Sequence, residues 1–343
     1  MLPIAVDIMG GDHAPRATVR GVCEALDMYP GLSPLLLVGD EAQVLAELAH
    51  AGKARHPKIT VVHAPEVVRM DEAATAAVRG KKQSSITVAV DLVRQGLARA
   101  VLSAGNTGAT LMVSTVKLRT LPGIERAAIA TILPSRRGRF ILLDAGANAD
   151  SKAEHLLHFA IMGDIYSREI LGHAKPRVGL VSNGTEPEKG NDLTRSAYQL
   201  LQQTPNLNFI GNVEGNDLFE GRVDVAVCDG FVGNVILKCA EGLAKALGHI
   251  LKENLKKSPV RVLGGVLAYG ALNELRQIGD YSEYGGAPFL GVNGAVFKCH
   301  GGSNAKAIRN GLRVVQEFLD HGVNERIVKR VQALGSVPAA PAP

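Results

Sequence analysis

The sequence predicts a doubly wound α/β fold with a mainly parallel sheet and a helical hairpin extension. Short apolar runs recur along the chain, helical apolar periodicities separate them, and the runs are continuously apolar instead of alternating. Strands that are buried on both faces have this pattern, and strand–helix alternation makes successive strands parallel. Ligand sites in such folds lie beyond the carboxyl ends of the strands.

The apolar runs predict where the strands lie. They are Ile4–Ile8, Leu35–Val38, Ile59–Val62, Ala100–Leu102, Ala127–Leu133, Phe140–Leu143, Val178–Val181 and Val223–Val227. Apolar side chains at helical spacing predict the helices between them. They are Ile86, Val90, Val93 and Leu97; Leu193, Ala197, Leu200 and Leu201; and Ile308, Leu312, Val315 and Leu319.

Further helices are expected from near Thr18, over residues 153–171, and from Val232 to Lys257, where Pro259 breaks the pattern. Residues 1–334 are predicted to form one catalytic α/β unit of two closely coupled subdomains that share a cleft. Residues 172–176 are the expected connection between the subdomains, and the Ala/Pro-rich residues 335–343 are an expected disordered tail.

Composition excludes several classes of protein. The 343 residues are 46% hydrophobic and 21% charged, which is typical of a soluble globular protein. With 4% aromatic residues and no Trp, stacking platforms for nucleic acid are not expected. The net charge of +5 favours anionic partners. Four cysteines without a C-x-x-C pair argue against disulfides and structural zinc and favour the reducing cytoplasm.

Neither end of the chain carries a membrane or export signal by this interpretation. The first residues predict a strand and not a signal peptide. The longest uncharged apolar stretch near the end, residues 262–272, is shorter than the ~20 residues of a transmembrane helix.

Four predicted strands are followed by loops that contain Gly and Asn. The loops are Ser103–Gly108, Asp144–Asn148, Ser182–Glu186 and Cys228–Asn234. Glycine allows close backbone approach, and Asn and Thr supply neutral hydrogen-bonding groups, so such loops together can surround an oxyanion. A single loop of this kind is an ordinary turn, but four at the functional edge of a sheet favour a binding site.

Familiar catalytic motifs are missing, including both phosphate-loop fingerprints, H-E-x-x-H and G-x-S-x-G. Asp12 and His13 follow the first strand and can contact a substrate, or Asp12 can cap a turn. His155 and His158 lie three apart on a predicted helix, but nothing nearby completes a metal site, so solvated histidines are favoured and no metal or cofactor is predicted.

Three residues in the later loops invite chemical hypotheses. Lys189 can hold phosphate as a point charge, or it is a solvated lysine beside two glutamates. Asn234 can donate its amide N–H to a carbonyl oxygen, or it is a capping residue at a helix start. Cys228 invites a covalent thioester, but a buried thiol is favoured because no histidine is adjacent in sequence.

The region around residue 260 combines apolar and cationic side chains. Val262, Val266 and Tyr269 form an apolar stripe close to Lys252, Lys256, Lys257 and Arg261. A membrane surface and a subunit interface both fit this pattern, on different faces of the helical pair.

Four segments in order resemble the bacterial phosphate acyltransferase family, PlsX. They are Ala5–Asp12, Gly105–Ala109, Asn183–Asn191 and Asp229–Asn234. The resemblance implies transfer of a fatty acyl group from acyl carrier protein to inorganic phosphate, which gives acyl phosphate for phospholipid synthesis. It also implies a fold similar to isopropylmalate dehydrogenases and phosphate acetyltransferases, and a cytoplasmic homodimer peripherally associated with the inner face of the cell membrane, with the downstream membrane acyltransferase as a further partner.

Lys189 and Asn234 match the positions associated with catalysis in that family. The second pKa of phosphate is about 6, so phosphate is largely a nucleophilic dianion at neutral pH, and a thiolate leaves readily. Direct attack of phosphate on the thioester is therefore predicted, with Lys189 holding phosphate and Asn234 polarising the carbonyl. The residues expected to complete the substrate site are Asp12, His13, Ser103, Asn106, Thr107, Gly108, Asp144, Asn148, Asn183, Gly184, Asp229 and Gly233.

The acidic carrier is expected to dock on basic side chains, either Arg136, Arg137 and Arg139 or the Lys252–Arg261 group. The alternatives are a nicotinamide-dependent dehydrogenase on the same fold and a non-catalytic scaffold at a lipid surface.

Overall fold

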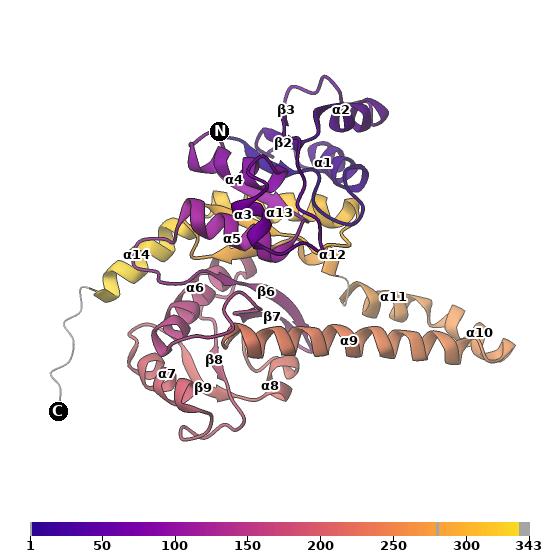
Figure 1. Cartoon of the computed structure of the whole chain (residues 1–343). Helices are drawn as coiled ribbons and strands as arrows, with labels where there is room; N and C mark the ends of the chain where they lie inside the picture. Colours follow the sequence, from indigo (N-terminus) through magenta and orange to yellow (C-terminus); the bar gives the residue numbers. More distant parts are fainter. Residues whose placement is uncertain (1, 279–280, 336–343) are drawn as a thin grey trace.

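The computed structural model describes residues 2–278 and 281–335, which form two sheet-containing bodies and a projecting arm (Figure 1). The larger sheet has seven strands in the order β3-β2-β1-β4-β12-β11-β5. They are β1 (Ile4–Asp7), β2 (Leu35–Gly39), β3 (Ile59–His63), β4 (Ala100–Ser103), β5 (Ala128–Ile129), β11 (Ala287–Leu290) and β12 (Ala295–Lys298). Strands β3, β2, β1, β4 and β12 are parallel, and the pairs of β11 are antiparallel.

The second sheet has five strands in the order β6-β7-β10-β8-β9. They are β6 (Thr131–Ser135), β7 (Gly138–Leu143), β8 (Val178–Val181), β9 (Phe209–Val213) and β10 (Val225–Val227). Strands β7, β10, β8 and β9 are parallel, while β6 pairs antiparallel with β7. The carboxyl ends of β7, β10 and β8 are therefore neighbours at one edge.

Helices cover both faces of the sheets because side chains alternate along each strand. In β1, Ile4 and Val6 belong to one apolar cluster with α1 and α13, whereas Ala5 belongs to another with α4 and α5. The helices beside the larger sheet are α1 (Arg16–Met28), α2 (Glu41–His50), α3 (Thr75–Arg79), α4 (Ser85–Arg94), α5 (Thr107–Leu118), α12 (Tyr281–Tyr284) and α13 (Ala305–Asp320). Those of the smaller body are α6 (Ala153–Leu171), α7 (Asp192–Gln203) and α8 (Gly215–Glu220).

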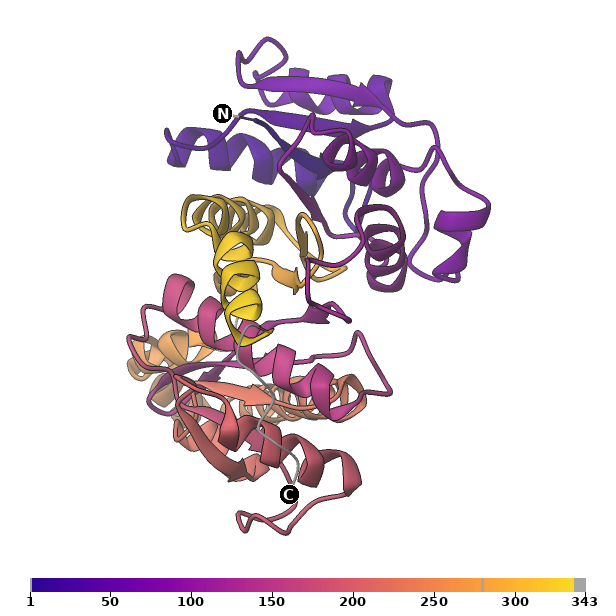
Figure 2. The same cartoon turned by 90° about the vertical axis from the view of Figure 1, so that its left-hand side faces the viewer.

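The two bodies share a core. One apolar cluster joins Ile4 and Leu102 of the larger sheet to Leu143 and Phe159 of the smaller body. Helix α14 (Val323–Gly335), yellow in Figure 2, lies between the bodies and packs against α6. A continuous apolar core of this kind couples the two sheets mechanically.

The arm is a helical hairpin that projects from between the bodies (Figure 1). Helix α9 (Gly230–Leu255) runs outward, α10 (Pro259–Leu267) forms the tip, and α11 (Tyr269–Ile278) turns back. The Ser258 side chain accepts a hydrogen bond from Arg261 N, and Pro259 occupies the first turn of α10, where its missing N–H costs nothing. No residue of α10 is buried.

The structure confirms the α/β class, the parallel strands and the helical hairpin, but it corrects several expectations. The described residues form two sheets instead of one. The apolar run 127–133 is divided between β5 and β6, which belong to different sheets, and β9, β11 and β12 were missed. Residues 172–176 do not connect the bodies, because they join α6 and β8 within the smaller one. Helix α4 ends at Arg94, before Leu97.

The chain instead crosses to the smaller body between β5 and β6 and returns ahead of β11. The predicted tail lies outside the described residues, except for Gly335 at the end of α14.

Candidate active site

The loops predicted to meet at one edge are divided between the two sheets. Asp144–Asn148, Ser182–Asn191 and Cys228–Asn234 follow β7, β8 and β10, which are parallel neighbours. Ser103–Gly108 follows β4 of the larger sheet. Three of the four loops therefore follow neighbouring strands of one sheet, and the fourth belongs to the other body.

Asp144 organises the loop after β7. Its buried carboxylate accepts hydrogen bonds at 3.0 Å from Ile129 N, Gly146 N and Ala147 N, and at 2.8 Å from Asn148 N. Burial raises the pKa of Asp144 despite these donors. The Asn148 amide is also turned inward, toward Asp144 Oδ2 at 2.9 Å and Ala127 O at 2.7 Å. Both side chains shape the loop, and their contact with substrate stays a prediction.

The amino end of α9 is packed directly on this loop. The Asp229 side chain accepts a hydrogen bond from Val232 N at 2.9 Å, which caps the helix, and Gly230 N donates to Asn148 O at 2.7 Å. A Cβ atom at Gly233 would lie 1.9 Å from Asp144 O, so glycine is required there. The contact holds the partially positive end of a long helix at the sheet edge, where it favours an anion.

Asn234 lies in the first turn of α9 with an exposed side chain. A Cβ atom at Gly146 would lie 3.4 Å from Asn234 Cβ and 3.6 Å from Asn234 Oδ1, so this amide borders the loop after β7. Its position suits a donor to a bound carbonyl oxygen, because it is fixed on a helix and open to solvent.

Lys189 lies on the loop between β8 and α7. Asn183 Oδ1 accepts a hydrogen bond from Gly190 N at 2.9 Å, and Lys189 N donates to Glu186 O at 3.1 Å, so the loop folds back on itself. The Lys189 stem lies over Gly184, where a Cβ atom would be 2.7 Å from Lys189 Cγ. The side chain is exposed, as a lysine that receives a phosphate from solvent must be.

Asp12 and His13 lie beyond β1 in the larger sheet. Asp12 N donates to Gly301 O at 2.9 Å, which joins the loop after β1 to the loop after β12. The N-cap of α1 is Pro15, and no side-chain cap bond is formed there. Asp12 and His13 remain predicted substrate residues.

Residues of the loop after β4 make hydrogen bonds and packing contacts that stabilise the surrounding structure. Ser103 Oγ donates to Asp7 Oδ2 at 2.7 Å and accepts from Gly105 N at 3.0 Å. Asn106 caps α5, which begins at Thr107, and its Nδ2 donates to three backbone carbonyl oxygens in residues 69–72. A Cβ atom at Gly108 would lie 3.0 Å from Ala74 Cβ. These contacts hold the segment before α3 against α5.

Residues of the larger body lie close to helix α9 and to strand β7 of the smaller body. His300 follows β12, and burial lowers its pKa, with Glu241, Lys238 and Lys245 of α9 among its charged surroundings. Arg139 of β7 lies over the ring of Tyr284 in α12, 5.2 Å from its centroid. His300 of the loop after β12 therefore lies within electrostatic range of α9, the helix that carries Asn234.

Sequence reasoning missed Asp7, Lys298 and His300. Asp7 and Lys298 end strands β1 and β12, and both are buried. A signal was present, since the apolar pair Val296-Phe297 is followed by Lys298-Cys299-His300-Gly301-Gly302, a lysine and then a glycine-rich loop. The run is too short to identify a strand by itself.

Two further hypotheses concerned cysteine and histidine. Cys228 is buried with Sγ 3.7 Å from Asp144 O, and burial raises its pKa well above the ordinary value, which fits the favoured interpretation of an unreactive thiol. His155 is buried, so the expectation of a solvated histidine is wrong there. Its Nδ1 accepts from Lys152 N at 3.1 Å, and its Nε2 lies 3.0 Å from Glu125 Oε2, so both ring nitrogens are engaged. Within the described ranges, no three His, Cys, Asp or Glu residues are grouped to hold a metal.

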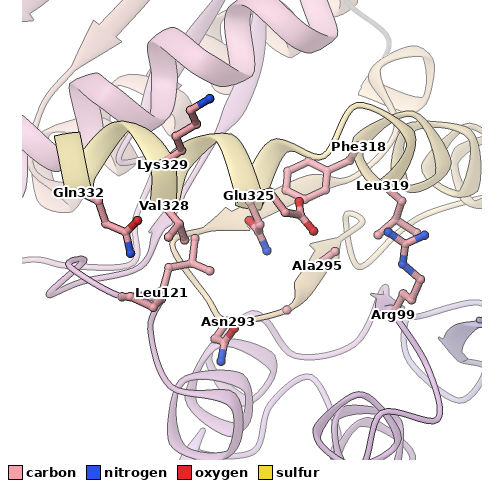
Figure 3. Close-up of a pocket in the computed structure, with 13 residues that line it drawn as sticks. Arg99, Leu121, Asn293, Ala295, Phe318, Leu319, Glu325, Val328, Lys329 and Gln332 are labelled. Atoms are coloured by element: carbon pink, nitrogen blue, oxygen red, sulfur yellow. The ribbon is translucent and has the colours of Figure 1, made fainter.

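A cavity of about 560 Å³ lies away from these loops (Figure 3). Arg99 and Ala295 line it near the amino ends of β4 and β12, and α14 forms its other wall. The proposed chemistry is not placed there, because ligands of parallel sheets bind at the opposite edge.

Comparison with known proteins gives concordant results. The model of a family described as "Fatty acid synthesis protein" matches residues 2–326. Phosphate acyltransferase of Pelotomaculum thermopropionicum is 50% identical over 333 residues, covering 97% of this chain and 96% of that protein. Phosphate acyltransferase of Geotalea uraniireducens is 50% identical over 329 residues, covering 96% and 94%.

Solved structures share the fold at low identity. A phosphotransacetylase from Streptococcus pyogenes superposes with a TM-score of 0.61 at 18% identity, covering 98% of this chain and 94% of that one. A branched-chain phosphotransacylase from Enterococcus faecalis gives a TM-score of 0.54 at 14% identity, covering 92% and 99%.

Proposed function

The chain belongs to the fatty acid synthesis protein family and is an acyltransferase, and from this premise we propose that it moves a fatty acyl group from acyl carrier protein to inorganic phosphate. The relatives at half identity are named phosphate acyltransferases, which supports phosphate as the acceptor. The product, an acyl phosphate, would enter phospholipid synthesis.

The observation that carries this proposal is the placement of Lys189 and Asn234. Strands β8 and β10 pair in parallel, with Val227 opposite Leu180, so the loops that follow them begin at the same level. Lys189 is on one loop, and Asn234 is in the helix that opens the other. Both side chains are exposed. A cation suited to phosphate and an amide suited to a carbonyl oxygen thus follow neighbouring parallel strands at one sheet edge, which supports the proposal.

In the proposed reaction, a phosphate oxygen attacks the thioester carbonyl carbon and forms the new C–O bond. The carbonyl π electrons move to oxygen, where the Asn234 amide stabilises the negative charge. Collapse of this intermediate breaks the C–S bond, and the thiolate leaves with the electron pair. Lys189 offsets the phosphate charge throughout. Since phosphate has a second pKa near ~6 and thiols have pKa values near ~8.5, neither a general base nor strong acid assistance is required.

The test is an assay of the purified chain with an acyl carrier thioester and phosphate. Acyl phosphate is trapped with hydroxylamine, and free carrier thiol is counted in parallel. Equal formation of both, dependent on phosphate, is the expected result. Release of thiol without acyl phosphate would contradict the proposal. Nicotinamide absorbance, followed in the same mixture with a dinucleotide added, tests the alternative of a dehydrogenase.

The acidic carrier is proposed to dock on basic side chains near the arm. Of the two groups considered, Arg136 pairs with Glu220 at 3.2 Å, and Arg139 stacks on Tyr284. Residues 252–261 carry further cations on an exposed helix end. A carrier KM that rises with ionic strength is expected, because such docking is electrostatic.

The arm is proposed to meet the inner surface of the cell membrane at its tip. Val262, Val266 and Tyr269 are 47%, 66% and 68% exposed, and Leu267 is 81% exposed. An apolar tip beside Lys256, Lys257 and Arg261 fits an anionic lipid surface. Across the described parts of the chain, no helix combines the length and apolar character needed to cross a bilayer.

A homodimer is proposed through the stem of the arm. Leu243, Leu247 and Ile250 on α9 are each more than half exposed. Such an apolar helix face is unfavourable in water, and a second copy of the chain would cover it. A membrane acyltransferase that consumes acyl phosphate is the proposed downstream partner at the same surface.

A further inference from the structure

Three buried polar residues lie in one row across the larger sheet, and only one of them, Ser103, is among the predicted substrate residues. Asp7, Ser103 and Lys298 are the last residues of β1, β4 and β12. The register pairs Asp7 with Ser103 and Ser103 with Lys298. Because paired residues of parallel strands point to the same face, the three side chains stand side by side at the carboxyl edge.

Asp7, Ser103 and Lys298 are polar, whereas the preceding residues on the same face of these strands are apolar. Two residues earlier in each strand lie Ala5, Val101 and Val296, which belong to one buried apolar cluster. Lys298 is 7% exposed and Asp7 is 2% exposed. Burying charges is costly unless they are paired and hydrogen-bonded, so a row of apolar side chains would serve stability at least as well. Stability therefore does not explain the lysine.

The hydrogen bonds of Lys298 indicate a different role. Its Nζ donates to Ala104 O at 3.0 Å and also to Cys299 O. Ala104 begins the loop that leads into α5, and Cys299 begins the loop that contains His300. One buried ammonium thus joins two loops at the sheet edge. The backbone bond from Asp12 N to Gly301 O attaches the loop after β1 to the same assembly.

Asp7 and Ser103 support the ammonium. Ser103 Oγ donates to Asp7 Oδ2 at 2.7 Å, and the Asp7 carboxylate is among the charges near Lys298. His300 of the loop after β12 lies within electrostatic range of Lys238 and Glu241 on α9. The ammonium therefore holds two loops of the larger sheet, and one of them carries the predicted substrate residues Asn106 and Thr107.

We propose that Lys298 is a positioning residue for acyl transfer, which holds the loops after β4 and β12 in the arrangement that the substrate site requires. This inference rests on the proposed function, since it assigns the residue to the same reaction. Lys298 contacts loop carbonyls and is not a catalytic residue.

The first test compares Lys298→Met with Lys298→Arg, and uses Lys329→Met, at an exposed lysine of α14, as a control. Lys298→Met is expected to lower kcat by about tenfold or more, since small misplacements in a site are costly, with a phosphate KM within about threefold of wild type. Lys298→Arg is expected to recover a large part of kcat. Hydrogen–deuterium exchange should accelerate at residues 104–106 and 299–302 in the Met variant, and Lys329→Met should change neither readout.

The second test is the pH profile of kcat. Burial lowers the pKa of Lys298 to about 8, with Cys299, Asp7, Asp12 and His300 as its titratable neighbours. Wild-type kcat should fall as pH rises through this value, because the neutral amine loses its charge-assisted hold on the carbonyls. In Lys298→Arg the fall should move to higher pH, since a guanidinium keeps its proton.

Unchanged kcat and unchanged loop exchange in Lys298→Met would overturn the inference. If Lys298→Met fails to fold, Lys298→Arg provides the test. A kcat of Lys298→Arg that falls at the same alkaline pH as that of wild type would equally overturn the inference. Wild-type protein without phosphate-dependent acyl transfer would contradict the proposed function itself, which separates the two failures.

Discussion

Gly233 in the first turn of α9 meets the carbonyl oxygen of Asp144 so closely that an added Cβ atom would lie 1.9 Å away. Asp144 in turn organises the loop after β7 through its buried carboxylate. This contact fixes the helix that carries Asn234 against the sheet edge.

Gly233→Ala is therefore expected to destabilise the fold by about 1–3 kcal/mol or more, because the methyl group has no room and the backbone must shift. Denaturant unfolding measures the change. Gly248→Ala on the same helix is the control, since a Cβ there meets nothing within 4 Å. That variant should be neutral or stabilised by up to ~1 kcal/mol through helix propensity. Equal stabilities of the two variants would contradict the close contact.

Lys189→Met should remove most acyl-phosphate formation, because the phosphate loses its counter-charge. The side chain is exposed, so the free energy of unfolding should stay within about 1 kcal/mol of wild type. Turnover and thermal unfolding are measured on one preparation. Lys329→Met, also exposed, is the matched control and should keep full activity. Normal turnover by Lys189→Met would remove this lysine from the mechanism.

Asn234→Ala should lower kcat by roughly 10²–10³-fold, the usual effect of removing one oxyanion donor. The phosphate KM should change little, because the amide is assigned to the carbonyl oxygen and not to phosphate. The kcat of Asn234→Asp should be no higher than that of Asn234→Ala, since the carboxylate places a negative charge where negative charge develops in the reaction. A variant whose loss lies wholly in phosphate KM would reassign Asn234 to phosphate binding.

The Arg177–Asp224 pair predicts a pH dependence of stability. Burial of Asp224 raises its pKa, but bonds from Arg177 at 2.8 and 3.0 Å outweigh burial and leave the pKa below its ordinary value of 3.8. A carboxyl with a lowered folded pKa stabilises the protein above its unfolded pKa, and this stability is lost as pH falls through the folded value. Wild type should therefore lose stability relative to Asp224→Asn below about pH 4. If the difference in unfolding free energy between wild type and Asp224→Asn stayed constant from pH 6 to about pH 2, titration of Asp224 would not contribute to stability.

A negative charge introduced at the tip of the arm should separate membrane contact from catalysis. Val266→Glu introduces a carboxylate on a residue that is 66% exposed, so folding should be unaffected. Sedimentation with anionic vesicles should fall severalfold, because the apolar surface is interrupted and the charge is repelled. Activity on soluble carrier thioester should remain. Val235→Glu, near the start of α9, is the comparison and should leave vesicle binding intact. If wild type, Val266→Glu and Val235→Glu bound vesicles equally, the membrane contact would lie elsewhere.

The amino-acid sequence by itself determined the local features of this protein. Continuous apolar runs identified β8 with its exact ends, and helical spacing over 153–171 matched α6. Pro259 after a polar residue marked the break at the tip, because proline cannot continue a helix interior. The glycine-rich loops after β4, β7, β8 and β10 were also visible, since glycine and asparagine mark such turns in any context.

The tertiary structure alone decided which of these features meet. Residues 127–133 form one apolar run in the sequence, yet Ala130 separates β5 from β6. Strand β5 pairs with β11, more than a hundred residues away, whereas β6 pairs with the next strand, β7, in a hairpin. Strand pairing depends on partners distant along the chain, so no local pattern reveals that there are two sheets. The same reason hides the row of Asp7, Ser103 and Lys298, which exists because the register of three strands aligns them.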